Sequence, residues 1–301
     1  MKNIAILGAT GYIGKTLTYE FISEDKDNLF LFSRSVDKLK VFKNNKNIKI
    51  LNYKKFNSLN YDVIINCTGI GDPNILRKDL NAIFKTTEEM DNMVLSYLVK
   101  NKKSIYVNLS SGAAYGDSFN KKIDENSKAT FNLNNFKVSE FYSIAKINSE
   151  AKHRPLKDFN IVDLRVFAFF SRFVDVEVGF LMSEIVSCLK NKKTFVTDDN
   201  NLKRDYITGK DLLNLIRLII KKGRINDSFD VYSLSPVSKF ELISFLKKKY
   251  DFKYEIIKGD KINKTKNFYF SNNKKAEKVL GYIPKFSSKT GIDSEIKYIL
   301  S

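Results

Sequence analysis

The residues with the clearest capacity for chemistry are a tyrosine and a lysine four positions apart, Tyr142 and Lys146. Four residues make about one turn of an α-helix, so in a helical segment these side chains are neighbours on one face. An ammonium group beside a phenol stabilises the phenolate, which brings a tyrosine pKa down from its ordinary value of about 10. Such a tyrosine can exchange a proton with a carbinol or carbonyl oxygen, so the pair predicts general acid and base catalysis.

This spacing alone is weak because the chain is rich in lysine. It recurs at Tyr206 with Lys210 and at Tyr254 with Lys258. Position distinguishes the first pair, which follows an apolar run at Ile105–Leu109 that continues into Ser110 and Ser111. The carboxyl ends of strands in an open parallel sheet form a binding crevice. A serine hydroxyl there can donate a hydrogen bond to a substrate oxygen, and the alternative is a serine that only caps a turn.

A glycine-rich loop near the start of the chain predicts dinucleotide binding. It follows the apolar run Ile4–Leu7 and opens a helix-like segment at Tyr12–Ile22. Its glycine spacing allows a tight turn, lets backbone N–H groups approach a pyrophosphate, and permits close packing of helix on strand. The helix N-terminus adds partial positive charge. The residues expected to contact the cofactor here are Gly8, Thr10, Gly11, Tyr12, Ile13 and Gly14.

The end of the second apolar run indicates which cofactor binds. Folds that bind NAD usually carry Asp or Glu there, about 20 residues after the loop, to bind the ribose 2′-hydroxyl. Here the run Leu29–Phe32 continues into Ser33 and Arg34, and the first acidic residue is Asp37. A guanidinium beside hydroxyls suits a 2′-phosphate, which it can bind bidentately. Ser33 and Arg34 therefore favour NADP(H), with NAD(H) still possible and a merely solvated Arg34 as the alternative.

The elements that must hold these residues alternate along the first half of the chain. Apolar runs typical of strands are Ile4–Leu7, Leu29–Phe32, Ile48–Leu51, Val63–Ile65, Ile105–Leu109 and Ile161–Val166. Further strands are expected at Phe229–Tyr232 and Tyr254–Ile257, and helices at Glu88–Val99, Gly209–Ile220 and Lys239–Tyr250. The alternation predicts βαβ units, and so an α/β fold with a Rossmann-type doubly wound parallel sheet.

Past Val166 the rhythm is less regular, which predicts a smaller, interleaved C-terminal substrate-binding region. We expect residues 1–166 to form the dinucleotide-binding domain, with 205–232 returning to it. Residues 167–204 and 233–301 would then form the substrate-binding region.

Further motifs accompany the glycine loop and the tyrosine–lysine pair. They are Ser110–Gly116 (SSGAAYG), Asp124-Glu125-Asn126, Glu150, Leu164-Arg165, Arg204–Ile207 (RDYI) with Asp211, Asn273–Ala276 (NKKA) and Leu280–Pro284 (LGYIP). With these motifs in this order over nearly its whole length, the sequence resembles the extended short-chain dehydrogenase/reductase family. That family comprises NAD(P)-dependent nucleotide-sugar epimerases, dehydratases and reductases.

The resemblance implies roles for particular residues. Ser111, Tyr142 and Lys146 would be the catalytic trio, with Tyr142 and Lys146 also contacting the cofactor at the nicotinamide ribose. The segment after the fourth strand would line the cofactor through Cys67, Thr68 and Gly69. The substrate would be bound by Ser111, Thr87 and Arg204. Alternatively, Arg204 pairs with Asp205 on the surface. The resemblance also implies a homodimer, formed through the helix of Tyr142 and the helix Glu88–Val99.

The positions after Ser111 separate the possible reactions. The family's 4,6-dehydratases place an acid pair near Ser111, but this chain has Gly112 and Ala113, so dehydration is disfavoured. Epimerases that use a Cys/His pair are disfavoured too. The only histidine, His153, lies about 16 Å along the helix from Tyr142 and is expected at the surface or in helix packing.

Two reactions at carbon 4 of a nucleotide-activated sugar remain. One is reduction of a 4-keto sugar by NADPH in surface polysaccharide biosynthesis, and the other is 4-epimerisation with retained NAD. The missing acid after the second strand favours the reductase.

Composition limits the other functions. The 301 residues include 52 Lys and Arg against 34 Asp and Glu, a net charge of +18, but only one His and two Cys. A metal site of His and Cys and a disulfide framework are therefore excluded. The single possible disulfide, Cys67–Cys188, favours a reducing setting. No run approaches the roughly 20 apolar residues of a membrane span, and the apolar start is too short for a signal peptide, so we expect a cytoplasmic protein.

The basic excess raises a rival class, a non-catalytic member of the fold that binds NADP(H) or RNA. Aromatic residues beside lysines, such as Lys253-Tyr254, are its only support. The lysines are dispersed, which is typical of a solvated surface, and the catalytic trio is intact. We therefore expect an enzyme with a nucleotide-sugar substrate and no nucleic-acid partner.

Overall fold

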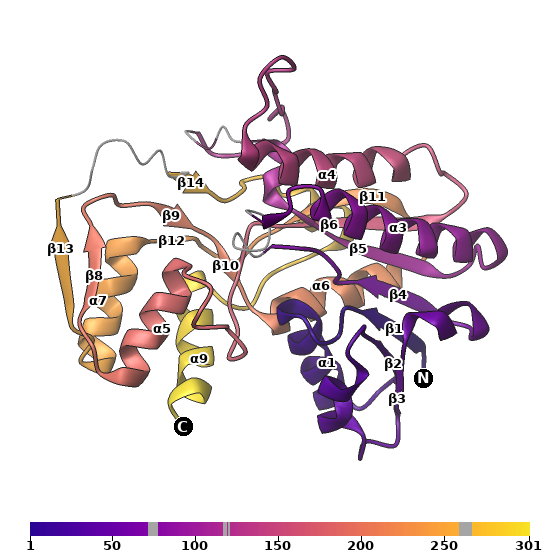
Figure 1. Cartoon of the computed structure of the whole chain (residues 1–301), viewed down its shortest axis with the longest axis horizontal. Coiled ribbons are helices and arrows are strands. Elements are labelled where there is room, and N and C mark those ends of the chain that lie inside the picture. Colours follow the sequence, from indigo (N-terminus) through magenta and orange to yellow (C-terminus); the bar gives the residue numbers. More distant parts are fainter. Residues whose placement is uncertain (72–77, 117–118, 120, 259–266) are drawn as a thin grey trace.

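The computed structural model describes residues 1–71, 78–116, 119, 121–258 and 267–301. Within them a seven-stranded sheet lies at the centre, and every neighbouring pair of its strands is parallel (Figure 1). The strand order is β11-β6-β5-β4-β1-β2-β3. The strands are β1 (Asn3–Leu7), β2 (Asn28–Phe32), β3 (Ile48–Leu51), β4 (Val63–Asn66), β5 (Ile105–Ser111), β6 (Asn160–Val166) and β11 (Asn226–Val231).

Helices cover both faces of this sheet. Figure 1 shows α1 and α6 on one side, and α3 and α4 on the other. Their bounds are α1 (Tyr12–Glu24), α3 (Ala82–Lys100), α4 (Val138–His153) and α6 (Gly209–Lys222). The strand order reverses between β1 and β4, and in open α/β sheets ligands bind outside the carboxyl ends of the strands at such a point. The predicted Rossmann-type α/β fold is confirmed.

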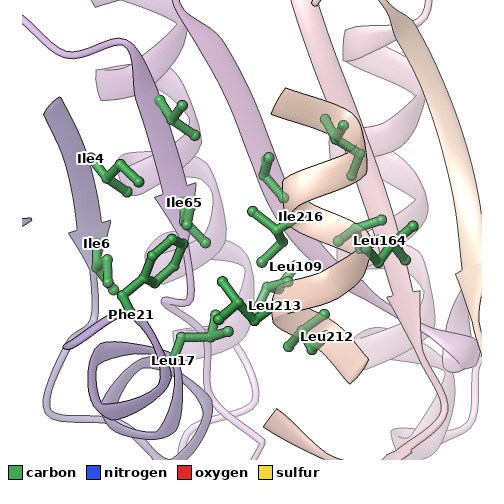
Figure 2. Close-up of a cluster of buried hydrophobic side chains, with 14 of the residues drawn as sticks. Ile4, Ile6, Leu17, Phe21, Ile65, Leu109, Leu164, Leu212, Leu213 and Ile216 are labelled. Atoms are coloured by element: carbon green, nitrogen blue, oxygen red, sulfur yellow. The ribbon is translucent and has the colours of Figure 1, made fainter. Parts of the chain in front are cut away.

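The core follows from the alternation of side chains along each buried strand. In β1, Ile4 and Ile6 join the layer of α1 and α6, whereas Ala5 and Leu7 join the layer of α3. Figure 2 shows the first layer, in which Phe21 of α1 and Ile216 of α6 lie over the sheet. Both faces are buried, so these strands are apolar on both sides, as expected of a parallel sheet.

The predicted strands and helices are confirmed, with ends that differ by a few residues. The largest difference is α3, which begins six residues before the predicted Glu88. The strand predicted at Phe229–Tyr232 is β11, which pairs with β6 and extends the central sheet. This pairing, together with the packing of α6 on α1, supports our proposal that 205–232 belongs with the dinucleotide-binding domain.

A smaller region lies beside the carboxyl edge of the sheet (Figure 1). Its core combines α5, α7 and α9 with short strands, among them the parallel pair β8 and β13. The elements are β7 (Ala168–Phe169), α5 (Leu181–Asn191), β8 (Phe195–Asp198), β9 (Lys203–Arg204), β10 (Tyr206–Ile207), β12 (Val237–Ser238), α7 (Lys239–Tyr250), β13 (Tyr254–Ile257), β14 (Phe268–Tyr269) and α9 (Ser288–Leu300). The helix α8 (Lys275–Leu280) packs instead on β11 and α6, with Ala276 in the core of the central sheet. Short 3-10 helices complete the chain at Val36–Phe42, Tyr53–Ser58 and Gly112–Tyr115.

Composition argues against a membrane span, a metal site and a disulfide framework. None of the helices in the described ranges is long and apolar enough to cross a membrane. The same residues contain no group of three or more His, Cys, Asp or Glu that could hold a metal ion. Cys67 and Cys188 are both free thiols.

Candidate functional site

The glycine loop joins β1 to α1 by packing backbone against backbone. Gly8 has a left-handed φ of +74°, and its carbonyl accepts a hydrogen bond from the Gly11 amide at 2.9 Å. A Cβ atom on Gly14 would lie 2.3 Å from the Gly8 carbonyl oxygen. A Cβ atom on Gly8 would lie 3.1 Å from the backbone of Cys67 and Thr68. The loop therefore needs glycine at these positions and lies directly against the turn after β4.

The first turn of α1 has backbone amides that can bind a phosphate. Within the described residues, the Gly11 N-cap makes no side-chain capping bond, so the amides of Tyr12, Ile13 and Gly14 are left for another acceptor. The side chain of Tyr12 is engaged elsewhere, since its hydroxyl accepts a hydrogen bond from the Ser171 amide at 2.7 Å. Any contact of Tyr12 with a cofactor would therefore come from its backbone.

The end of β2 is tied to the glycine loop through Ser33. The Ser33 hydroxyl is buried and lies 3.0 Å from the Thr10 hydroxyl. Arg34, the next residue, is exposed. The first acid after this strand, Asp37, forms an ion pair with Lys40 at 2.6 Å. The edge where a cofactor ribose would lie thus presents a guanidinium and hydroxyls.

The turn after β4 lies between the glycine loop and the predicted catalytic lysine. A Cβ atom on Gly69 would lie 3.7 Å from the Lys146 ammonium. Lys146 is buried, and its ammonium donates a hydrogen bond to the Leu109 carbonyl at 2.9 Å. The ammonium also lies 5.9 Å from the centre of the Tyr142 ring. Lys146 is therefore placed between Tyr142, the end of β5 and the Cys67–Gly69 turn.

Ser111 ends β5 and is buried beside Tyr269 of β14. The two hydroxyls are 3.3 Å apart, and the Ser111 hydroxyl also accepts a hydrogen bond from the Ala113 amide at 3.2 Å. Burial raises the pKa of the Tyr269 phenol, and repulsion from nearby Tyr142 adds to the effect. Tyr269 therefore lies against Ser111 at the end of β5 and near enough to Tyr142 for their charges to interact.

The three tyrosine–lysine pairs differ sharply in their placement. Tyr142 and Lys146 lie one turn apart on α4. Tyr206 belongs to β10, whereas Lys210 belongs to α6. Tyr254 lies in β13 of the smaller region, and Lys258 follows that strand. Only the first of these three pairs has the helical geometry that brings both side chains to one face.

The position after Ser111 has no room for a side chain. A Cβ atom on Gly112 would lie 2.4 Å from the ring of Phe167. Phe167 also contacts Tyr269, with ring centres 5.3 Å apart, and belongs to a small aromatic cluster with Tyr115 and Phe119. The ring of Phe167 therefore occupies the space that an acidic side chain at position 112 would need, and elimination of water requires such an acid.

Arg204 and Thr87, the two other residues predicted to contact the substrate, differ in their surroundings. Arg204 on β9 has its guanidinium 5.6 Å from the centre of the Tyr269 ring, and burial lowers its pKa. Asp205 accepts hydrogen bonds from the Ser233 and Ser288 hydroxyls inside the protein. Thr87 is buried on α3, and its hydroxyl has no hydrogen-bond partner among the described residues. Arg204 thus lies beside Tyr269, which is the neighbour of Ser111, and the substrate-binding roles of Arg204 and Thr87 stay predictions.

Tyr269 is the residue beside Ser111 that sequence reasoning missed. It lies about 130 residues beyond Tyr142, in a strand of two residues that has no periodic pattern. The only signal is a tyrosine shortly before the Asn273–Ala276 motif. Its neighbour Phe268 is 36 % exposed, so the sequence alone gives no reason to place one ring inside and the other outside.

His153 lies at the end of α4 and is fully buried, which excludes the predicted surface position and leaves the alternative of helix packing. Its Nε2 atom lies 2.7 Å from an Asp91 carboxylate oxygen, and its Nδ1 atom lies 2.9 Å from Asp163. Burial alone would lower the pKa of His153, but hydrogen bonds and charge attraction from Asp163 and Asp91 outweigh it and raise the pKa to about 9.

This raised pKa predicts that the protein loses stability in alkali. A histidine whose pKa rises from 6.5 to about 9 on folding stabilises the folded state fully below pH 6.5, and the contribution disappears as the pH rises through about 9. Its size is about 3 kcal/mol. We expect the free energy of unfolding, from urea titrations, to fall with pH over this range, and to fall much less in His153→Gln. Because the chain has one histidine, a single imidazole NMR titration gives the pKa, and a midpoint near 6.5 would refute the prediction.

Comparison with known proteins places this site in a family. The family model described as "NAD dependent epimerase/dehydratase family" matches residues 4–234, more than three quarters of the chain. The chain therefore belongs to the NAD dependent epimerase/dehydratase family, whose members are nicotinamide-dependent enzymes of the extended short-chain dehydrogenase/reductase type. The resemblance inferred from the motifs is confirmed. A comparison with curated protein sequences found no match.

Solved structures share the fold over the whole chain. UDP-glucuronic acid 4-epimerase from Bacillus cereus, in complex with UDP-glucuronic acid and NAD, has a TM-score of 0.79 at 15 % identity and covers 99 % of this chain and 98 % of its own. ADP-L-glycero-D-manno-heptose-6-epimerase from Helicobacter pylori has a TM-score of 0.79 at 18 % identity, and the match covers 99 % of this chain and 96 % of that one. UDP-glucose 4-epimerase from Thermotoga maritima has a TM-score of 0.79 at 19 % identity, and the match covers 98 % of each chain. At these identities the likeness concerns the fold.

Proposed function

We propose that the protein reduces the keto group of a nucleotide-activated 4-keto sugar, with NADPH as the cofactor. The observation that supports the proposal is the position of Lys146, whose ammonium donates to the Leu109 carbonyl two residues before Ser111 and lies 5.9 Å from the Tyr142 ring centre. A Cβ atom on Gly69 would lie 3.7 Å from the same ammonium. We infer that Ser111 and Tyr142 border one space beside the glycine loop. A carbonyl oxygen in that space can accept a hydrogen bond from Ser111 and a proton from the Tyr142 hydroxyl. The Lys146 ammonium then stabilises the negative charge left on Tyr142.

The residues on the cofactor side fit a nicotinamide dinucleotide. Glycine at positions 8 and 14 lets the loop pack backbone against backbone, and the amides in the first turn of α1 suit a pyrophosphate. The Cys67–Gly69 turn and Lys146 would hold the nicotinamide ribose end, and Ser33 and Arg34 the adenosine end. When bound, the cofactor supplies the hydride that the keto carbon receives.

The preference for NADPH depends on Arg34. We expect Arg34→Ala to weaken NADPH binding about 10- to 100-fold, the range for a lost charged hydrogen bond, and to leave NADH binding nearly unchanged. Titration of each reduced cofactor by its fluorescence measures both affinities. Lys38→Ala removes a charge from a nearby exposed position and is the matched control. If Arg34→Ala weakens both cofactors equally, Arg34 does not recognise the 2′-phosphate.

A second candidate is 4-epimerisation of a nucleotide sugar with retained NAD. It is favoured by the similar structures, since those from Bacillus cereus and Thermotoga maritima are named as 4-epimerases. An epimerase needs the same tyrosine, serine and lysine, because the sugar carbon is first oxidised and then reduced again. The distinction is that the cofactor is consumed in reduction and regenerated in epimerisation.

Cofactor stoichiometry tests the proposal. The purified protein is mixed with UDP- and dTDP-linked 4-keto hexoses and NADPH, and the nicotinamide absorbance is followed together with the sugar product. Reduction predicts one NADPH consumed for each hydroxyl sugar formed. Interconversion of UDP-hexoses without added cofactor, with NAD retained in native mass spectrometry, would establish the epimerase instead. Inactivity with both substrate classes would contradict both candidates.

We also propose that the protein forms a homodimer through α3 and α4. Apolar side chains are exposed just before and at the start of α4, with Leu133 78 % and Val138 59 % exposed. Burying them against a second copy would remove apolar surface from water. Size-exclusion chromatography with light scattering measures the mass directly, and a monomer at high concentration would contradict the dimer.

A further inference from the structure

A ladder of polar side chains crosses the otherwise apolar sheet on its α3 and α4 side. Asn66 of β4 lies in register with Asn108 of β5, and Asn108 lies in register with Asp163 of β6. All three are at least 95 % buried. One end of the ladder is the turn after β4, which lies against the glycine loop, and the other end is the carboxylate that contacts His153.

The Asn66 amide shapes that turn. Its Oδ1 atom accepts hydrogen bonds from the Thr68 amide at 3.0 Å and from the Thr68 hydroxyl at 2.5 Å. The turn keeps this form only if the amide presents oxygen, and not nitrogen, to Thr68. An asparagine amide can flip, so its orientation must be determined by the groups on its other side.

Two hydrogen-bond chains determine this orientation, and each begins at a carboxylate that can only accept. Asp91 accepts from the Tyr106 hydroxyl at 3.1 Å, so the Tyr106 oxygen is left to accept from Asn66 Nδ2 at 3.0 Å. Asp163 accepts from Asn108 Nδ2 at 2.8 Å, so Asn108 Oδ1 faces Asn66 Nδ2 at 3.4 Å. Both chains require nitrogen on the inner side of Asn66 and therefore oxygen toward Thr68.

Both carboxylates converge on His153, which keeps them in place. A doubly protonated imidazole donates to Asp91 through Nε2 and to Asp163 through Nδ1. A neutral imidazole has one donor, so one carboxylate would face a lone pair. Two cations also contact these carboxylates, Lys152 of α4 at 2.7 Å from Asp91 and Arg154, which directly follows α4, at 2.6 Å from Asp163. Tyr106 of β5 packs edge-on against the imidazole.

We propose that this network is a positioning device for the cofactor, in which protonated His153 holds Asp91 and Asp163, and through them Asn66, so that the Cys67–Gly69 turn keeps the form that receives the nicotinamide dinucleotide. The inference rests on the proposed function, because it takes that turn to line the cofactor. It assigns His153, Tyr106 and Asn108 a role at a distance from the substrate. Cofactor affinity is then coupled to the protonation of a residue at the far end of α4.

The coupling has a reciprocal consequence that needs no variant. If the cofactor binds about fivefold more tightly when His153 is protonated, bound cofactor must raise the titration midpoint of His153 by the logarithm of that factor, about 0.7 pH unit. The fivefold figure is about 1 kcal/mol, the net worth of one hydrogen bond. NMR of the only imidazole in the chain, with and without saturating NADPH, measures the midpoint. A midpoint that rises supports the proposal, and one that does not move overturns it.

A conservative substitution of Tyr106, which lies between Asp91 and Asn66 in the hydrogen-bond network, tests the same proposal. Tyr106→Phe removes the acceptor for Asn66 Nδ2 and keeps the ring, so NADPH should bind about fivefold more weakly and the midpoint should no longer respond fully to NADPH. Tyr97→Phe is the matched control, because it removes a buried hydroxyl of the same layer, which accepts a hydrogen bond from the Tyr61 amide at 2.9 Å. Equal affinities in Tyr106→Phe and the unaltered protein would overturn the proposal.

These outcomes separate the inference from the proposed function. If the unaltered protein binds neither NADPH nor NADH, the proposed function fails and the inference falls with it. Suppose instead that the unaltered protein binds one of the cofactors, that Tyr106→Phe binds it equally well, and that bound cofactor does not move the His153 midpoint. Then only the inference fails. Loss of folding in Tyr106→Phe leaves the reciprocal titration of the unaltered protein to decide.

Discussion

Replacing Tyr142 with phenylalanine is expected to lower the rate of keto-sugar reduction about 10³-fold, within the range for loss of a general acid. The change removes the phenol hydroxyl that we propose as the proton donor, and it keeps the ring beside Lys146. Cofactor affinity should change by less than about fivefold, since only one hydrogen bond to the ribose is lost. Single-turnover oxidation of NADPH with a 4-keto sugar nucleotide measures the rate.

The control for this experiment is Tyr254→Phe. Tyr254 has a lysine at the same sequence spacing, but it lies in β13 of the smaller region and pairs with β8. We expect its replacement to leave the rate unchanged. Equal rates in Tyr142→Phe and the unaltered protein would remove Tyr142 from the mechanism, and equal losses in both variants would show that the tyrosines act through the fold.

Replacing Gly14 with alanine is expected to abolish measurable cofactor binding. The added Cβ atom would lie 2.3 Å from the Gly8 carbonyl oxygen and 3.1 Å from the Ala9 Cα atom. Because both neighbours are backbone, no side-chain rotation relieves the contact, and α1 must move away from the loop that binds the pyrophosphate. The cost to the free energy of unfolding should be about 1–3 kcal/mol, as for overpacked cores.

Gly71→Ala is the stability control, since a Cβ atom there has nothing within 4 Å among the described residues. Its melting temperature should match that of the unaltered protein. Thermal unfolding and fluorescence titration with NADPH measure the two effects of Gly14→Ala. Unchanged cofactor affinity in a folded Gly14→Ala protein would contradict the assignment of this loop to the cofactor.

The central sheet could be predicted because its signals are local. Strands such as β4 (VIIN) are short apolar runs bounded by polar residues, and each is followed by enough chain for a helix. The glycine loop and the Tyr142 and Lys146 pair are also local, since their spacing and their place after a strand fix the geometry. A parallel sheet then brings the ends of β1, β4 and β5 to one edge.

The remainder of the site depends on contacts between distant segments. Tyr269 reaches Ser111 because β14 pairs with β9, a contact between two-residue strands that carry no pattern. Gly112 could be read as the absence of an acid, but the reason that position has no side chain is the ring of Phe167, 55 residues later. Such contacts are set by tertiary packing, which no window of sequence reports.

The polar ladder shows an intermediate case. Asn66, Asn108 and Asp163 each interrupt an apolar strand, and this is visible in the sequence. Buried polar groups must find partners, so the interruptions indicate a network in the core. The sequence does not show that they are in register, or that His153 from the end of α4 joins them between two carboxylates. The sequence therefore leaves two positions open for His153, the surface or the packing between helices.

The most direct test of the account is the transfer of deuterium from cofactor to sugar. The protein is incubated with a 4-keto sugar nucleotide and NADPH deuterated at both C4 positions of the nicotinamide, and the sugar product is weighed by mass spectrometry. The account predicts one deuterium on carbon 4 of each hydroxyl sugar, and no labelled product with Tyr142→Phe over the same time. A hydroxyl sugar formed without deuterium would contradict hydride transfer within this site.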